Sequence, residues 1–386
     1  MRSAQLTSDM LLERAKALWH EARADRFARA VWLLTEAYSS KLNEAQCIDF
    51  EGMIGNATKL IENGHYSSPF KLILIDEFQD ISEPRANLIK ALRSQRPFTK
   101  VFAVGDDWQS IYRFAGSDIT LFTQFAQHFG SCWIGKLQQT YRCNQLIAEV
   151  AANFVQRNPG QMSKDVQSLR PKIPRSIRVI PVKVEWEKPS MESACQQLLN
   201  RLNGFAARIA TKWQSETKPK LSVLVLSRYN IQNPYRSGSS EFSHIEVRSM
   251  TFHRSKGLEA DYTVLLDVSE GNFGVPSRIE DDELLQLVIP SPETFPHAEE
   301  RRLFYVAITR ASRGVYLLTN QSKPSRYINE LKQIGGEEVS LETLDGHPLQ
   351  ECPACTKGFL VSRVGKGGNT FEGCSEYPTC QYTASN

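Results

Sequence analysis

Two apolar runs that each end in acidic and amide residues constrain the fold of this chain most. Leu72-Ile73-Leu74-Ile75 leads into Asp76-Glu77-Phe78-Gln79-Asp80, and the run 101–104 leads into a second polar stretch at 105–113. Short continuous apolar runs fit parallel strands that are buried on both faces. Ligands bind at the carboxyl ends of such strands. We therefore expect an α/β fold with a binding site at the edge where both polar stretches lie.

The residue types at these two strand ends suit the chemistry of a magnesium nucleotide. Asp76 is placed to hold a metal ion, and Glu77 to activate a water molecule. Gln109 is suited to sense a γ-phosphate by hydrogen bonding. Trp108 and Tyr112 beside it are suited to stack on nucleic-acid bases regardless of sequence. The alternative for both aromatic residues is a place in the hydrophobic core.

The rest of the chain alternates helix and strand patterns. Residues 8–45 and 48–62 have the apolar spacing of helices. Further apolar strand runs lie at 223–226, 263–268 and 315–319. Residues 157–188 are rich in Arg, Lys and Pro and are expected to form a connector, and 271–296 an acidic surface loop. No apolar run is long enough to span a membrane, so we expect no membrane partner.

Two helix patterns each carry an arginine suited to phosphate chemistry. Gln139-Thr140-Tyr141-Arg142 is expected to open a helix that continues to Val155. Arg142 there is suited to reach a transferring phosphoryl group, and Tyr141 to stack on adenine. The amphipathic stretch 299–311 carries Arg310 near its end. The alternative for Arg310 is a solvated side chain on a packing helix.

A turn before the strand at 263–268 combines hydroxyl, His and Lys groups with a glycine. The stretch 247–261 includes His253, Lys256 and Gly257, and such groups suit contacts to backbone phosphates. Glu259 in the same turn is suited to accept a hydrogen bond from a ribose hydroxyl. The alternative for His253 is a structural role.

These five segments, in this order, resemble the UvrD/Rep family of superfamily 1 DNA helicases over roughly residues 25–335. The resemblance implies two RecA-like domains that clamp ATP between them, with single-stranded DNA running across both. It implies that Asp76 binds Mg²⁺, that Glu77 is the general base and that Gln109 reads the γ-phosphate. The other implied roles are arginine fingers for Arg142 and Arg310, adenine stacking for Tyr141, a ribose contact for Glu259, and DNA contacts for Trp108, Tyr112 and His253.

The family's first motif, the Walker A phosphate loop Gly-x-x-x-x-Gly-Lys-Thr, is absent from the 386 residues. The stretch 130–137 has the Gly and Lys spacing, but Leu137 stands where Mg²⁺ requires a hydroxyl. This stretch also follows the acidic motif instead of preceding it. We therefore expect an incomplete first sheet. We also expect the chain to be the C-terminal portion of a longer helicase, or to work with a partner chain that supplies the loop.

Four of the eight cysteines form a cluster near the end of the chain. Two residues separate Cys352 from Cys355, eighteen separate Cys355 from Cys374, and five separate Cys374 from Cys380. Four thiolates on two short loops suit tetrahedral Zn²⁺. A module this small requires its metal to fold.

The cluster resembles the zinc ribbons at the C-terminus of bacterial type IA topoisomerases. That resemblance implies contacts to single-stranded DNA through Phe359, Phe371, Tyr377 and Tyr382. The alternative is a structural or partner-binding ribbon. The other cysteines read as reduced thiols of a cytoplasmic protein.

The sequence as a whole predicts an α/β protein with two RecA-like domains built on parallel sheets, the first one incomplete, and a small zinc ribbon. We expect a helical remnant of an accessory domain, the partial first domain, the second domain and the ribbon at 1–45, 46–140, 141–335 and 345–386. The expected function is an ATP-dependent 3′–5′ DNA helicase or translocase in repair or recombination, with ATP, Mg²⁺ and Zn²⁺ as cofactors. Its expected partner is single-stranded or partially duplex DNA. The alternative is a non-catalytic DNA-binding or split-helicase subunit.

Overall fold

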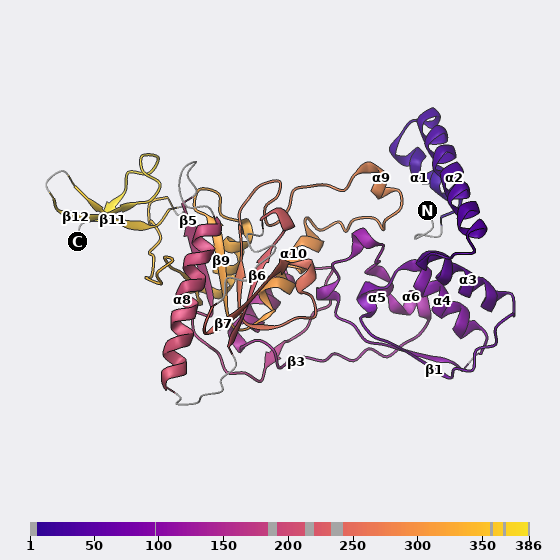
Figure 1. Ribbon diagram of the computed structural model, residues 1–386, viewed down its shortest axis with the longest axis horizontal. Coiled ribbons are helices and arrows are strands. Elements are labelled where there is room, and N and C mark those ends of the chain that lie inside the picture. Colours follow the sequence, from indigo (N-terminus) through magenta and orange to yellow (C-terminus); the bar gives the residue numbers. More distant parts are fainter. Residues whose placement is uncertain are drawn as a thin grey trace. The chain divides into compact units, whose positions relative to one another are not determined.

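The computed structural model describes residues 6–96, 98–183, 191–212, 220–232, 242–355, 358–365 and 368–384. The chain forms two compact units, which are described separately (Figure 1). The first unit comprises Met1–Gly135, Pro159–Met162 and Glu280–Glu299, and the second unit comprises the rest. Within the described residues, no helix is long and apolar enough to cross a membrane.

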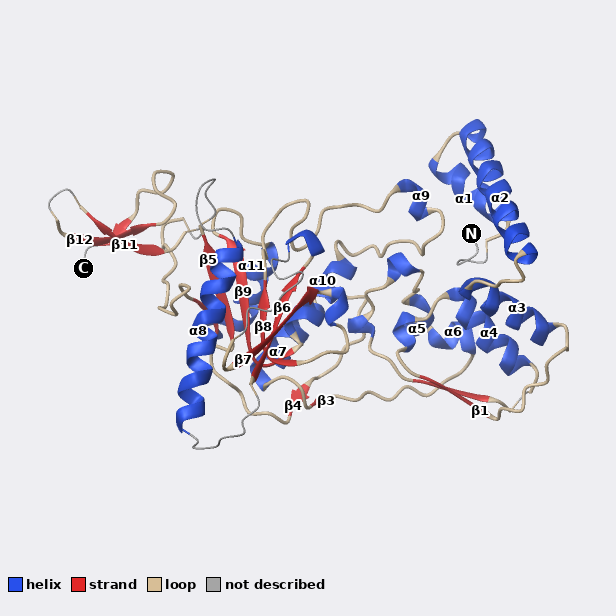
Figure 2. Cartoon of the chain, viewed as in Figure 1, coloured by secondary structure: helices blue, strands red, loops and turns tan. Residues whose placement is uncertain are grey.

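A six-stranded, fully parallel sheet forms the centre of the second unit (Figure 2). In spatial order its strands are β10 (Val339–Leu341), β5 (Ile177–Val182), β9 (Ala311–Asn320), β8 (Ala260–Leu265), β6 (Leu221–Ser227) and β7 (Ile245–Thr251). The runs predicted at 223–226 and 315–319 are confirmed as parts of central strands, and the run predicted at 263–268 overlaps the last three residues of central strand β8. Successive residues such as Val225 and Leu226 are both buried, as expected for strands covered on both faces.

Helices cover this sheet. Helix α8 (Met191–Lys212) packs against one face through a core that includes Leu198, Leu199 and Leu202. Helices α7 (Gln145–Val155), α10 (Ala298–Ile308) and α11 (Arg326–Gly335) meet one another through Phe154, Phe304 and Tyr327. A short pair of strands, β3 (Gln139–Thr140) and β4 (Gln167–Ser168), precedes and follows α7.

Helix α7 begins later than the sequence predicted. The Asn144 side chain accepts hydrogen bonds from the N–H groups of Leu146 and Ile147, so Asn144 is the N-cap. The same side chain donates to the carbonyl of Arg313 at 3.2 Å, which fixes the helix start beside β9. Tyr141 and Arg142 therefore lie in a turn before the helix.

The first unit contains a parallel pair of strands, β1 (Leu72–Ile75) and β2 (Lys100–Ala103). Both strands were predicted. The prediction that both of their faces are buried was wrong, because Leu74 is 69% exposed and Phe102 is 55% exposed. Only one face packs on a core, which contains Phe78 and Phe129. Further helices of this unit include α3 (Phe50–Glu62), α4 (Glu83–Ser94), α5 (Thr120–Thr123) and α6 (Phe125–Phe129).

The predicted helical segment 8–45 is two helices, α1 (Ser8–Leu18) and α2 (Glu21–Glu44). They pack on each other and on Leu287, and the Trp19 indole donates to the Glu283 carboxylate at 2.9 Å. Glu283 begins the one-turn helix α9 (Glu283–Gln286). The stretch predicted as a surface loop at 271–296 therefore contains a buried anchor at Leu287.

The end of the chain forms a three-stranded antiparallel sheet, β11 (Leu360–Val364), β12 (Thr370–Cys374) and β13 (Thr383–Ala384). We call residues 351–384 the ribbon. Within the second unit, Lys332 of α11 forms an ion pair with Glu351 at the start of the ribbon.

Candidate nucleotide-site residues and metal centre

The two acidic residues after β1 lie on a sharp turn at the strand end. Glu77 has φ 49° and ψ 40°, the left-handed region that non-glycine residues rarely adopt. Asp76 stabilises this turn, because its Oδ1 accepts from the Glu77 N–H at 2.8 Å. Phe78, fully buried, anchors the next residue in the core. Both carboxylates are exposed as a result and are accessible to a ligand.

The buried amide of Gln79 connects the two strand ends, a role the sequence did not suggest. Its Nε2 donates to Glu77 Oε2 at 2.5 Å, and its Oε1 accepts from the Asp106 N–H at 2.9 Å. Gly105 permits this approach, since a Cβ there would lie 2.6 Å from Gln79 Oε1. The signal in the sequence is the pairing of a Gln two residues after the acidic pair with a Gly at the next strand end.

Asp106 extends this network to Gln109. Its Oδ2 accepts from Gln109 Nε2 at 2.6 Å, and its Oδ1 accepts from the Trp108 N–H at 3.2 Å. We call Glu77, Gln79, Asp106 and Gln109 the strand-end network. The residues predicted as general base and γ-phosphate sensor are therefore joined by hydrogen bonds within the first unit.

The two aromatic residues next to Gln109 differ in exposure. Trp108 is 1% exposed, and its indole N–H donates to the Met162 carbonyl at 3.0 Å. Its ring belongs to the core, so the predicted DNA contact of Trp108 does not agree with its burial, and the alternative reading fits. Tyr112 is half-buried, and burial, followed by the charges of Asp80 and Glu77, raises the pKa of its hydroxyl. A DNA contact by Tyr112 stays a prediction.

In the second unit, Arg142 and Glu259 lie together. Arg142 Nε is 3.5 Å from Glu259 Oε2, and Glu259 remains mostly exposed. Tyr141 is also exposed, so its ring is accessible for stacking. The structure thus brings together two of the residues predicted to contact nucleotide in this unit.

Arg310 and His253 lie in surroundings that the sequence did not predict. Arg310 follows α10 and is fully buried, where it donates to the carbonyls of Val306 at 2.9 Å and Leu258 at 3.2 Å. An arginine finger must reach a phosphate, so the buried position of Arg310 does not agree with that role. Burial, followed by the charge of Arg228, lowers the pKa of His253 to about 4. The imidazole is therefore neutral at pH 7 in the free protein, and a DNA contact by His253 stays a prediction.

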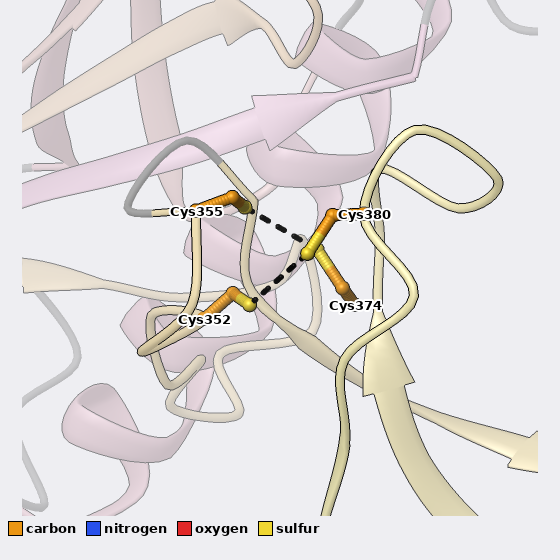
Figure 3. Close-up of side chains that lie close together, drawn as sticks. All are labelled: Cys352, Cys355, Cys374 and Cys380. Carbon is orange, nitrogen blue, oxygen red and sulfur yellow. Dashed lines mark hydrogen bonds between the residues drawn. The ribbon is translucent and has the colours of Figure 1, made fainter.

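The four predicted cysteines converge on one point (Figure 3). Their sulfur atoms all lie within 4.8 Å of one another, with Cys352 and Cys380 3.8 Å apart and Cys355 and Cys374 3.6 Å apart. Thiolates around tetrahedral zinc at a Zn–S distance of about 2.3 Å are separated by about 3.8 Å. The arrangement fits a Zn²⁺ ion, and all four are free thiols, not disulfides.

The aromatic residues of the ribbon are unequally exposed. Tyr377 is 62% exposed, and the guanidinium of Arg363 lies 5.6 Å from its ring centroid. Phe359 is buried at the base of the ribbon, so the predicted DNA contact of Phe359 does not agree with its position. Phe371 and Tyr382 are half-buried, and their DNA contacts stay predictions.

Comparison with protein families finds matches along most of the chain. Residues 3–130 match the UvrD/REP helicase N-terminal domain and 183–322 the UvrD-like helicase C-terminal domain. Residues 349–386 match the topoisomerase DNA binding C4 zinc finger.

Similar curated proteins are helicases. DNA helicase IV of Escherichia coli strain K12 is 38% identical over 80% of this chain and 43% of that protein. The putative ATP-dependent DNA helicase YjcD of Bacillus subtilis is 31% identical over 69% of this chain and 33% of that protein. ATP-dependent DNA helicase PcrA of Bacillus subtilis is 31% identical over 33% of this chain and 18% of that protein. The chain thus spans less than half the length of these relatives.

Proposed function

Because the chain belongs to the UvrD/REP helicase family, we propose that it acts as an ATP-dependent DNA helicase that moves 3′ to 5′ in DNA repair or recombination, in the cytoplasm. The observation that supports this most is the strand-end network, which joins Glu77 to Gln109 through Gln79 and Asp106. A hydrogen-bonded link between a general base and a γ-phosphate sensor suits ATP hydrolysis.

The proposal assigns each residue a task. Asp76 holds Mg²⁺, which neutralises charge on the phosphates. Glu77 takes the proton of the attacking water, and Gln109 reads the γ-phosphate. Arg142, Glu259 and Tyr141 contribute phosphate, ribose and adenine contacts. The arginine-finger role of Arg310 rests on the family resemblance alone. To reach a phosphate, its guanidinium would have to give up its hydrogen bonds to the carbonyls of Val306 and Leu258.

Turnover also requires a phosphate loop, and no Gly-x-x-x-x-Gly-Lys-Thr stretch occurs in the 386 residues. We propose that the loop comes from residues outside this sequence, on the same or a partner chain. The test is single-stranded-DNA-stimulated ATP hydrolysis by the purified chain, beside its Glu77→Gln variant. The expected result is background turnover by both. If the original chain hydrolyses ATP and Glu77→Gln abolishes this activity, the result would support Glu77 as the general base. It would also contradict the requirement for a phosphate loop from outside this sequence.

A second candidate function is DNA binding without catalysis, which the exposed Tyr377 beside Arg363 favours. Fluorescence anisotropy with a labelled single strand separates the two. Binding that weakens with salt, weakens in Tyr377→Ala and ignores ATP would favour this candidate. An affinity that changes with ATP would favour the helicase.

A further inference from the structure

A cavity of about 150 Å³ lies between helix α8 and the sheet of the second unit. None of the residues given a role above lines it. Its wall combines three arginines, three aromatic rings and one leucine, namely Arg178, Arg201, Arg208, Phe205, Tyr262, Tyr316 and Leu202. The wall therefore gathers three guanidinium groups against aromatic rings.

The floor of the cavity is set by strand register. Arg178 of β5 lies opposite Tyr316 of β9, and Tyr262 of β8 lies opposite Gly314 of β9. A Cβ on Gly314 would lie 3.0 Å from Arg178 Nη1 and 3.1 Å from the Tyr262 ring. The glycine therefore lets the guanidinium of Arg178 lie on the sheet beside two tyrosines. That guanidinium is 5.1 Å from the Tyr316 ring centroid, which holds it in place.

The wall has more positive charge than the described residues of the protein neutralise. Glu342 is the carboxylate that meets it, with Oε1 2.9 Å from Arg201 Nη1 and Oε2 3.7 Å from Arg178 Nε. Arg208 forms no ion pair within the described part of the chain, and Arg178 Nη1 has no hydrogen-bond acceptor there. Three guanidinium groups and one carboxylate leave a formal charge of +2.

The geometry points to a site for a phosphate dianion, either free phosphate or the terminal phosphate monoester of a DNA strand. Guanidinium groups match the oxygens of phosphate in pairs, and two negative charges balance the wall better than one carboxylate does. The cavity is smaller than the roughly 300–1,000 Å³ of pockets that enclose whole organic ligands. It therefore encloses the phosphate group, and any attached strand lies outside.

The test is isothermal titration calorimetry of the intact chain with three probes. They are inorganic phosphate, a short oligonucleotide with a 5′-phosphate, and the same oligonucleotide with a 5′-hydroxyl. Saturable binding of inorganic phosphate identifies free phosphate as a ligand. A 5′-phosphate that tightens oligonucleotide binding identifies a strand end as the ligand.

Two variants locate the binding. Arg208→Gln removes an exposed charge that is not part of the packing, and Gly314→Ala displaces Arg178 from the floor. Each is expected to weaken binding of the effective probe about tenfold or more, as loss of a charged hydrogen bond does. Lys323→Gln, which removes an exposed positive charge of the same unit outside the cavity, is the matched control and is expected to leave affinity unchanged.

Some results of these titrations would contradict a phosphate site in this cavity. Equal phosphate affinity in the original protein and Arg208→Gln would overturn the inference. So would a lack of saturable binding of inorganic phosphate together with equal affinity for the two oligonucleotides. Thermal melting of each variant shows whether it is folded. If Gly314→Ala does not fold, Arg208→Gln alone decides the result, because its side chain is exposed.

Discussion

At the scale of single residues, the chain shows how one amide organises a site. Gln79 is fully buried, yet its side chain holds the carboxylate of Glu77 and the backbone of Asp106 at once. A buried donor or acceptor that loses its partner costs more than a hydrogen bond contributes. The orientation of the Glu77 carboxylate therefore depends on Gln79, a residue with no assigned catalytic role.

We predict that Gln79→Met, which keeps the length but removes the amide, destabilises the first unit by about 1–3 kcal/mol. The physical reason is the Asp106 N–H that is left without its acceptor. Urea unfolding followed by tryptophan fluorescence measures the change. Gln127→Ala, at an exposed position of α6, is the control and should change stability little. A neutral result for Gln79→Met would contradict the role of the amide.

Glu270 gives a residue-scale prediction for pH. The hydrogen bond from Arg326 is the main cause that lowers the pKa of Glu270 to about 2, and Arg278 adds to it. A carboxylate with a depressed pKa in the folded state stabilises the protein above its ordinary pKa. That stabilisation is lost as pH falls from about 4.5 towards 2.

The expected outcome is that Glu270→Gln lowers the melting temperature at pH 7, and that this effect shrinks steadily as pH falls from about 4.5 towards 2. Differential scanning calorimetry of both proteins across this range is the measurement. A difference between the two proteins that stays constant with pH would show that the carboxylate charge is not involved.

At the scale of elements, the two sheets contrast. The central strands β9, β8 and β6 of the second unit are covered on both faces, whereas β1 and β2 present Leu74 and Phe102 to solvent. Apolar strands with free edges favour association between chains. The same type of sequence run thus has different consequences, depending on how many elements pack against it.

We predict that Leu74→Lys combined with Phe102→Lys reduces aggregation without lowering the melting temperature. Both side chains lie on the exposed face, so charge there opposes association and costs little packing. Static light scattering against time at a fixed protein concentration is the measurement. Leu121→Lys, a buried position, is the contrast and should destabilise the first unit. Unchanged scattering in the double variant would assign the aggregation to another surface.

At the scale of the whole molecule, the ribbon is a module whose core is a cluster of four cysteines. Because such small modules lack a sufficient hydrophobic core, binding of the metal provides the free energy of folding. The six tryptophans of the chain all lie outside the ribbon. Loss of the metal should therefore unfold the ribbon without changing the tryptophan fluorescence.

The prediction is that a strong chelator, or Cys374→Ser, makes residues 351–384 sensitive to protease while tryptophan fluorescence stays unchanged. Zinc content by atomic absorption should fall from about one ion per chain towards none. Limited proteolysis followed by mass spectrometry locates the cleavage. Protection of the ribbon in metal-free protein would show that zinc is not required for its fold.

The sequence by itself determined the family, five of the parallel strands and the four metal-ligand candidates, because apolar runs and cysteine spacing are local patterns. It missed β5, which lies in the stretch predicted as a connector. It also placed Asp76 and Glu77 at a strand end. Only the tertiary structure decided which of the predicted side chains are accessible: Trp108 and Arg310 are enclosed, whereas Tyr141 and Tyr377 are exposed. It also revealed the bridge made by Gln79 and the arginine-lined cavity over Gly314. Burial and cross-strand register depend on residues far apart in the chain, and no local pattern encodes them.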